Sequence, residues 1–260
     1  MILDELASHA KERVAAAKKI MPEDALKSAA FSIPNGGFRF ENTLRKPGMS
    51  FICEVKKASP SKGIISPDFP YLGIARSYEA AGADCVSVLT EPKWFLGSDS
   101  IFRDIRSEIS LPMIRKDFTV DEYQIYEAKL MGADAVLLIC ALLDTETIAK
   151  YLGICGALGM TALVEAHDEA EIASAVSAGA RVIGVNNRNL KNFTVDFTNA
   201  ARLREKIPSA AVFVAESGVS SPEDVGALSK IGADAILVGE ALMRAGDRKV
   251  LLSKMRSASG

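Results

Sequence analysis

The chain has 260 residues, enough for one large domain or two modest ones, and its 48% hydrophobic and 25% charged residues are ordinary for a globular protein. A net charge of −2 provides no basic footprint for nucleic acid, and the longest apolar run, AVLLICALL at 135–143, is too short to span a bilayer. The first twenty residues, MILDELASHAKERVAAAKKI, place acids before any base and contain no apolar core, so we predict neither a signal peptide nor a transit peptide.

Residues 1–46 precede the repeating part of the chain. One face of an amphipathic helix is formed there by Leu3, Leu6, Ala10, Val14 and Ala17. A loop-rich piece around IPNGGFRF follows it. A helix bound to a membrane surface would carry aromatic residues and a basic face, whereas this one has mixed charge and no aromatic residue. We therefore predict a helical extension, 1–46, packed as a lid or brace on the remainder, 47–260.

The next predicted element is a strand at 51–56, in the stretch FICEVKKASPSKG. Its apolar residues suit a sheet interior, but Glu54 and Lys56 interrupt them. Because strand side chains alternate faces, these two side chains share one side. They either mark a solvated edge or hold an acid and a base inside the molecule.

Four later segments resemble one another: AAGADCVSVLT (80–90), LMGADAVLLIC (130–140), SAGARVIGVNN (177–187) and KIGADAILVGE (230–240). Each is typical of a helix end, a glycine in the left-handed conformation and then a buried strand. The intervals of 50, 47 and 53 residues separate the glycines Gly82, Gly132, Gly179 and Gly232. Such intervals are about twice the ~30 residues of one strand–helix–strand unit.

A further strand is therefore expected midway between each pair, and the chain provides LPMIRKDF (111–118), MTALVEAH (160–167) and AAVFVAES (210–217). Helical patterns such as DTETIAKYLGICGALG (144–159) fill the gaps, with acids in the first turn. Eight strands alternating with eight helices predict an α/β fold, a closed (β/α)8 TIM barrel of eight parallel strands. The alternative, an open doubly wound sheet, normally has fewer strands and a glycine-rich first turn, where this chain has ASPSKG.

Charged residues gather at the predicted carboxyl ends of alternate strands. The first strand ends with Glu54 and Lys56, and the third, fifth and seventh end with Lys116, Glu165 and Glu216. The even-numbered strands end with uncharged residues: Thr90, Cys140, Asn186 and Gly239. In a barrel, alternate strands share an interior layer and this face carries the chemistry. We therefore predict a ring of three carboxylates and two ammonium groups at the mouth.

Two other placements of these charges are possible. Pointing outward beneath the helices, each unpaired charge would cost several kcal/mol. Ordinary solvated surface charges would explain one such residue, but they explain five at matching strand ends poorly. In a crowded ring, a desolvated lysine, or one beside another cation, becomes a usable acid near neutral pH, and a carboxylate beside another can hold its proton. Such a ring can perform several proton transfers without a metal or a cofactor.

The sequence gives little sign of a metal site. It has two histidines, His9 in the first helix and His167 after the fifth strand, so histidine ligation of a metal is not predicted. An oxygen-ligated Mg²⁺ among the glutamates remains open, although the neighbouring lysines would compete with it. No C-x-x-C pair occurs, and we predict buried thiols in a reducing cytoplasm for Cys53, Cys85, Cys140 and Cys155.

The loops after the seventh and eighth strands, AESGVSSPED and VGEALMR, precede helix starts. Backbone N–H groups near Ser217, Gly218 and Gly239 are placed where barrels commonly bind phosphate. A lone glycine is usually a turn former, but two in the adjacent expected loops predict a phosphorylated small-molecule substrate, over which Lys56 and the SPSKG loop could close. Trp94 and Phe95, after the second strand, are either loop anchors or walls of an aromatic pocket.

Seven segments spanning residues 51–243 together resemble the indole-3-glycerol phosphate synthase family of tryptophan biosynthesis: EVKKASPSKG, SVLTEPKWFLG, LPMIRKDF, LVEAHDE, IGVNNRNL, VAESGV and LVGEALM. The E-x-K-x-x-S-P-S and R-K-D-F elements are specific to that family, whereas the SG and VGE elements occur in many phosphate-binding barrels. The resemblance implies a carboxy-lyase that needs no cofactor. Its reaction closes the ring of 1-(2-carboxyphenylamino)-1-deoxyribulose 5-phosphate and releases CO₂ and water.

The resemblance also implies residue roles. Lys116 is the general acid for ring closure, Ser59 and Arg188 grip the substrate carboxylate, and Phe95 and Phe118 line the aryl pocket. The candidates for the dehydration steps are Glu165, Lys56 and Glu54, with the division among them open. Substrate and lysines are oriented by Asn186 and Glu216. The phosphate group is held by Lys56, Ser217, Gly218, Gly239 and the backbone N–H of Glu240.

Three other functions stay open at this point. A phosphoribosylanthranilate isomerase would use a cysteine and an aspartate, a Schiff-base aldolase would use Lys56 or Lys116 as nucleophile, and a non-catalytic barrel would only bind a phosphorylated metabolite. The expected partner is a phosphorylated aryl-amino sugar substrate, with no nucleic acid and no membrane. We expect a monomer or a weak homodimer.

Overall fold

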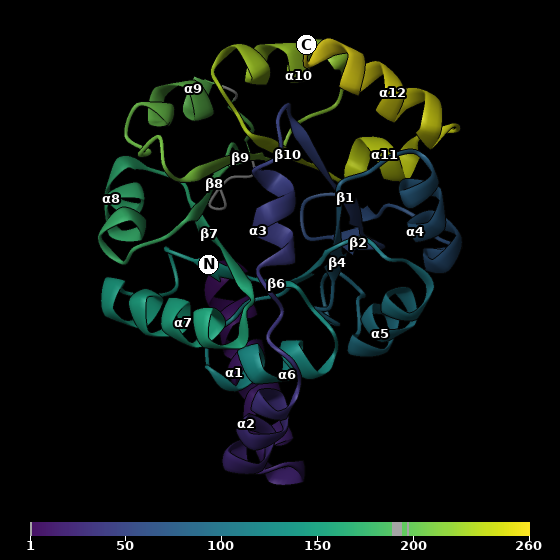
Figure 1. The fold of residues 1–260 in the computed structure, drawn as a ribbon. Coiled ribbons are helices and arrows are strands. Elements are labelled where there is room, and N and C mark those ends of the chain that lie inside the picture. Colours follow the sequence, from purple (N-terminus) through teal and green to yellow (C-terminus); the bar gives the residue numbers. More distant parts are fainter. Residues whose placement is uncertain (1, 189–193, 197) are drawn as a thin grey trace.

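In the computed structural model, which describes residues 2–188, 194–196 and 198–260, eight parallel strands close into a barrel (Figure 1). They follow one another around the barrel in chain order, and the first pairs with the last. This closure confirms the predicted TIM barrel and excludes the alternative, an open doubly wound sheet. The barrel strands are β1 (Ser50–Val55), β4 (Cys85–Leu89), β5 (Met113–Lys116), β6 (Ala135–Ile139), β7 (Thr161–Ala166), β8 (Val182–Asn186), β9 (Val212–Glu216) and β10 (Ala235–Val238).

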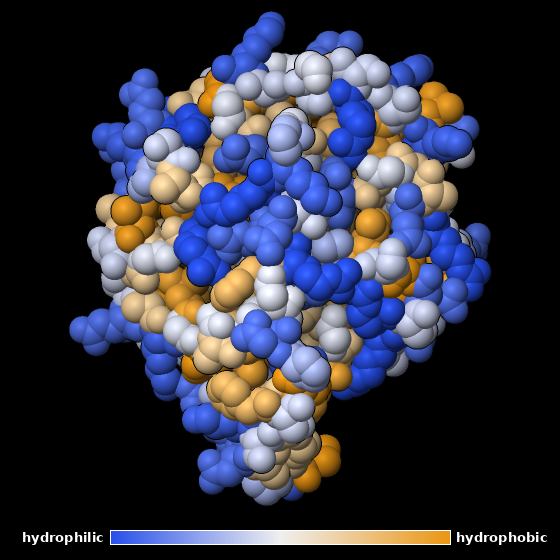
Figure 2. Space-filling view, in the orientation of Figure 1, coloured by the Kyte–Doolittle hydropathy of each residue, from blue (hydrophilic) through white to orange (hydrophobic). Residues whose placement is uncertain are grey.

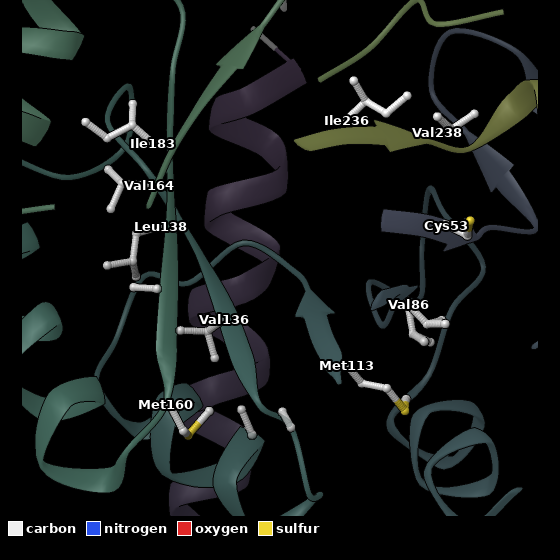
Figure 3. Close-up of a cluster of buried hydrophobic side chains, with 14 of the residues drawn as sticks. Cys53, Val86, Met113, Val136, Leu138, Met160, Val164, Ile183, Ile236 and Val238 are labelled. Atoms are coloured by element: carbon white, nitrogen blue, oxygen red, sulfur yellow. The ribbon is translucent and has the colours of Figure 1, made fainter. Parts of the chain in front are cut away.

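The strands bury both of their faces. Outward-pointing side chains such as Val136 and Val164 pack beneath the helices (Figure 3). Inward-pointing side chains, among them Ile52, Ile114 and Leu163, fill the barrel interior. Burial of such a side chain contributes about 1.5–3 kcal/mol, so both layers stabilise the closed sheet.

Helices surround the barrel, and the repeat glycines end every second one of them. Gly82, Gly132, Gly179 and Gly232 follow α4, α6, α8 and α10 with φ between +76° and +88°, the left-handed conformation predicted for them. The surrounding helices are α4 (Tyr71–Ala80), α5 (Asp99–Glu108), α6 (Tyr123–Leu130), α7 (Thr145–Leu158), α8 (Glu169–Ser177), α9 (Thr198–Arg204), α10 (Pro222–Lys230), α11 (Glu240–Arg244) and α12 (Arg248–Ala258). A two-stranded hairpin, β2 (Ala58–Ser59) and β3 (Gly63–Ile64), follows β1.

The amino-terminal extension differs from the prediction of one helix and a loop. Among residues 2–46 the structure has three helices: α1 (Ile2–Ile20), α2 (Glu23–Ser32) and α3 (Arg39–Leu44). The second buries little more than Leu26 and Ala30, and the third has six residues, so neither leaves a clear apolar period in the sequence. The division at residue 46 stays a prediction.

The helix α3 closes the amino-terminal end of the barrel. Its Phe40 and Leu44 are buried in the same cluster as the inward residues Ile52 and Ile114. Figure 2 shows the face that α3 crosses, where hydrophilic side chains cover much of the middle of the view. The opposite face is therefore the one left open for chemistry. Among the described helices, none is long and apolar enough to cross a membrane.

Candidate active site

The inward-pointing side chains of the strands change from apolar to charged toward the carboxyl-terminal face of the barrel. Two residues after Ile52, Ile114 and Leu163 come Glu54, Lys116 and Glu165, and these side chains line a cavity of about 740 Å³. The cavity is lined by all fourteen residues predicted for the site: Glu54, Lys56, Ser59, Phe95, Lys116, Phe118, Glu165, Asn186, Arg188, Glu216, Ser217, Gly218, Gly239 and Glu240. Besides Phe95 and Phe118, its apolar lining includes four residues that were not predicted: Leu89, Leu137, Ile139 and Leu237.

Lys116 lies among carboxylates from three strands. Its Nζ is 3.6 Å from Oε2 of Glu165 and 3.6 Å from Oε2 of Glu216. Asn186 donates a hydrogen bond of 3.1 Å from Nδ2 to Oε1 of Glu165, which fixes that carboxylate. Burial disfavours the charge of Lys116, but the carboxylates Glu216, Glu165 and Glu54 outweigh it and raise the pKa of the lysine.

A second acid–base pair lies beside the first. Nζ of Lys56 is 2.5 Å from Oε1 of Glu54, so these two residues form an ion pair with a buried carboxylate and a partly buried lysine, and not a solvated edge. Ser87 also donates to Glu54, at 3.4 Å. Burial would raise the pKa of Glu54, but Lys56 and Lys116 outweigh it and lower that pKa. This carboxylate is therefore ionised at neutral pH.

The protonation pattern confirms one expectation and corrects another. Burial raises the pKa of Glu216 to about 8, and Glu165 and Glu54 add to this rise, so one crowded carboxylate holds its proton as predicted. The prediction that desolvation would make the lysine a readier acid is wrong for Lys116, because its pKa is raised. The neighbouring carboxylates decide the direction of the shift.

The end of β5 is held by a polar network that sequence reasoning missed. Arg115 points outward beneath the helices and pairs with Asp99, Glu127 and Asp117. Asp117 accepts two hydrogen bonds from Arg13 of α1, at 2.6 and 3.0 Å, and another from Oγ1 of Thr90 at 2.6 Å. Lys116 is thus fixed between two buried, ion-paired residues, of which Asp117 also borders the cavity.

The two aromatic residues after β4 have different surroundings: Phe95 lines the cavity, and Trp94 anchors the loop. Phe95 packs against Phe118 in a tilted arrangement, with ring centroids 6.1 Å apart, and both rings line the cavity. Trp94 instead packs edge-on against His9 of α1, at 5.5 Å. The buried carboxylate of Glu91 accepts backbone hydrogen bonds from residues 93–95, which fixes Phe95 in place.

The first helix also contributes to the cavity wall. Ile2, Leu3 and Leu6 of α1 line the cavity, so the segment predicted as a lid or brace borders the site itself. The amphipathic pattern indicated which face of the helix would be buried. The pattern could not indicate that part of this face would line the active-site cavity.

The loops after β9 and β10 form the polar rim. Ser217 and Gly218 adopt φ of 68° and 84°, a conformation that a serine rarely takes and that turns this loop sharply at the cavity. Glu240 pairs with Arg244 at 3.1 Å and with Lys62 at 3.8 Å. The rim therefore carries two cations that the sequence did not single out.

The remaining predictions concern cysteines, histidines and metals. Cys53, Cys85 and Cys155 are buried, and Cys140 is partly buried. His167 lies in the loop after β7, where its Nδ1 is 3.0 Å from the carbonyl oxygen of Asn186. In the part of the chain that the structure describes, no group of three or more His, Cys, Asp and Glu residues is arranged to hold a metal ion. The segment IGVNNRNL (183–190) ends in residues 189 and 190, which lie outside the described residues.

Comparison with known proteins points to one family. The family model described as indole-3-glycerol phosphate synthase matches residues 3–255. A relative of that name from Ruminiclostridium cellulolyticum is 55% identical over 260 residues, covering 100% of each chain. Relatives of the same name from Endomicrobium trichonymphae and Lachnoclostridium phytofermentans are 48% and 43% identical, and the alignments cover 95% and 99% of this chain and 96% and 99% of theirs.

Solved structures at low identity share the architecture. A 3-hexulose-6-phosphate synthase from Salmonella typhimurium aligns with a TM-score of 0.67 at 16% identity, covering 81% of this chain and 98% of that one. A thiamine phosphate pyrophosphorylase from Pyrococcus furiosus aligns with a TM-score of 0.60 at 17% identity, covering 85% and 97% of the two chains. At these identities the likeness concerns the fold alone.

Proposed function

This chain belongs to the indole-3-glycerol phosphate synthase family, and we propose that the charged ring around Lys116 performs the chemistry of that family's reaction. The enzyme is a carboxy-lyase of tryptophan biosynthesis that acts on a phosphorylated small molecule. The observation that carries the proposed roles is the position of Lys116, on the cavity wall and 3.6 Å from each of two carboxylates. An assay for fluorescent indole product from the carboxyphenylamino-ribulose phosphate, run with and without chelator, tests the reaction directly.

In the first step, Lys116 donates its proton to the ribulose carbonyl oxygen as the aromatic carbon that bears the carboxylate attacks the carbonyl carbon. The carbon–carbon bond forms, and the oxygen becomes a hydroxyl. The carboxylates of Glu165 and Glu54 hold Lys116 charged, although they also raise its pKa. The anionic oxygen that develops in the transition state offsets this, because it attracts the proton of the nearby ammonium group.

The next step removes the carboxylate from the ring carbon. Ser59 and Arg188 line the same cavity and would hold this group until the C–C bond breaks. The electron pair of that bond restores the aromatic ring, and CO₂ leaves. Phe95 and Phe118 would contact the aryl group of the substrate, since their adjoining rings form an aromatic part of the cavity wall.

Dehydration completes the indole ring. An acid protonates the leaving hydroxyl group, and a base removes a proton from the adjoining carbon, so that water leaves and a double bond forms. Two acid–base pairs are available on the cavity wall, Glu54 with Lys56 and Glu165 with Lys116. We propose that these pairs divide the two transfers. Asn186 orients the second pair through its hydrogen bond to Glu165.

The phosphate group would lie at the rim, against the loop of Ser217 and Gly218 and the loop of Gly239 and Glu240. A Cβ at Gly239 would come within 2.6 Å of Oε1 of Glu54 and 3.2 Å of Nζ of Lys56. Gly239→Val is therefore expected to raise KM by obstructing the phosphate and also to lower kcat by disturbing that ion pair. Steady-state kinetics with the phosphorylated substrate measure both. An unchanged KM would place the anion elsewhere.

The raised pKa of Glu216 predicts a pH dependence. As the pH rises through about 8, Glu216 loses its proton, adds a negative charge beside Lys116 and repels an anionic substrate. We expect kcat/KM of the wild type to fall over that range. Glu216→Gln stays neutral at every pH, so its profile is expected to lack this fall. The same fall in the glutamine variant would assign the ionisation to another group.

We further propose that the enzyme works in the cytoplasm as a monomer or weak homodimer, without nucleic-acid or membrane partners. The net charge of −2 and the four free cysteines support this setting. Size-exclusion chromatography with light scattering across a range of protein concentrations tests the oligomeric state.

A further inference from the structure

The carboxyl group of Glu216 lies in an unusual position. It is buried, and its Oε2 is 3.6 Å from Nζ of Lys116. Its Oε1 makes no hydrogen bond with any of the residues that the structure describes. Beyond the contact of Oε2 with Lys116, the position of this carboxyl group therefore depends on what packs against Oε1.

The surface on which Oε1 rests is the backbone of Gly184 in β8. This residue faces the interior, because its neighbours Ile183 and Val185 belong to the outward-facing cluster, and Figure 3 shows Ile183 among these side chains. Pairing along the sheet places Gly184 in register with Glu165 of β7. Gly184 thus lies within the layer of charged residues.

A side chain at this position would occupy the place of the carboxyl group. A Cβ built on Gly184 would lie 2.0 Å from Oε1 and 3.1 Å from Cδ of Glu216. The backbone of Gly184 is not in the left-handed region, so conformation does not require glycine here. The glycine is needed for the space that it leaves.

We propose that Gly184 is a positioning residue of the active site, whose missing side chain leaves the recess that holds the Glu216 carboxyl group beside Lys116. This inference rests on the proposed role of Lys116 as general acid. If Gly184 served only the packing of the barrel, its replacement would affect stability and not catalysis. Loss of a positioning recess instead lowers kcat, since a small misplacement of a catalytic group can cost ~10²-fold.

Gly184→Ala tests the proposal. The atoms in its way, those of the Glu216 carboxyl group and Cδ1 of Leu163 at 3.2 Å, are the ends of flexible side chains, so these side chains are expected to move and the barrel to remain folded. We expect kcat to fall by ~10–10²-fold, with a smaller change in KM and a Tm close to that of the wild type. Gly153→Ala is the matched control, because Gly153 is exposed on α7 and a Cβ there meets no atom within 4 Å. A normal kcat for Gly184→Ala would overturn the proposal.

A second variant shows whether the effect passes through Glu216. Aspartate is one methylene shorter and leaves room for the alanine, so Gly184→Ala/Glu216→Asp is expected to have a higher kcat than Gly184→Ala alone. Losses that simply multiply would overturn the proposal, because residues that do not interact behave independently.

The experiment remains decisive if Gly184→Ala does not fold. In that case Gly184→Ala/Glu216→Ala is compared with Glu216→Ala, where the recess is already empty. Equal kcat values support the inference, and a further loss overturns it. Lys116→Met separates this result from the proposed role of Lys116: if that variant remains active, the role itself fails, whereas inactive Lys116→Met without coupling between Gly184 and Glu216 overturns the recess alone.

Discussion

Replacement of Lys116 by methionine is expected to lower kcat by ~10²–10⁴-fold, the range for loss of a general acid, with a modest change in KM. Methionine keeps most of the length and the apolar stem of the lysine but cannot donate a proton. Its introduction also leaves Glu165 and Glu216 without the cation that lies 3.6 Å from each of them. The pKa of Glu216 should then rise further, because the positive charge that lowers it has been lost.

Product fluorescence in steady-state and single-turnover experiments measures this loss. Lys254→Met is the matched control, since Lys254 is exposed on α12, away from the cavity, and this variant should keep normal kinetics. Single-turnover data are needed because product release can limit kcat and hide a slower chemical step. Near-normal turnover of Lys116→Met would refute its assignment as the general acid.

The second large effect is expected on stability. Asp117→Ala should lower the free energy of unfolding by ~3–5 kcal/mol, the usual cost of removing one partner from a buried ion pair. Asp117 accepts hydrogen bonds from Arg13 and Thr90 and lies 3.7 Å from the buried Arg115. Without it, Arg115 keeps two carboxylate partners, Asp99 and Glu127, and α1 loses the bidentate contact of Arg13 with the residue that follows β5.

Urea denaturation of the Asp117 variant at neutral pH measures that cost. The exposed Asp68 supplies the control, because Asp68→Ala should change the free energy of unfolding very little. Burial would raise the pKa of Asp117, but Arg13 and Arg115 outweigh it and lower that pKa. The stabilisation is therefore present above the ordinary aspartate pKa and is lost as the pH falls through the lowered value. An unfolding free energy equal to that of the wild type would mean that the network is not coupled to global stability.

Most of the barrel could be predicted because its information is local. The helix-ending glycines recur with the chain's own period, and the strands after them are apolar on both faces, as a parallel sheet between helices and an interior requires. The helices α2 and α3 escaped this reasoning for a physical reason. They are fixed by contacts with distant elements, such as Phe31 of α2 against Tyr126 of α6, and not by their own pattern.

The site was predictable where it follows the two-residue period of a strand. Glu54, Lys116 and Glu165 continue the inward register of Ile52, Ile114 and Leu163, so their meeting could be inferred. The partners of Asp117 could not, because Arg13 is 104 residues away. The direction of the Lys116 pKa shift was also out of reach, since it depends on how many carboxylates surround one lysine.

The placement of α3 beneath the barrel determines where substrate can enter and where products can leave. With Phe40 and Leu44 closing its base, the interior is a blind well and not a tube. The substrate must enter, and CO₂, water and product must leave, past the same rim, which residues of α1 and of the hairpin after β1 help to line. The small molecules and the bulky product therefore leave through one opening. An obstruction at the rim would slow the release of all three.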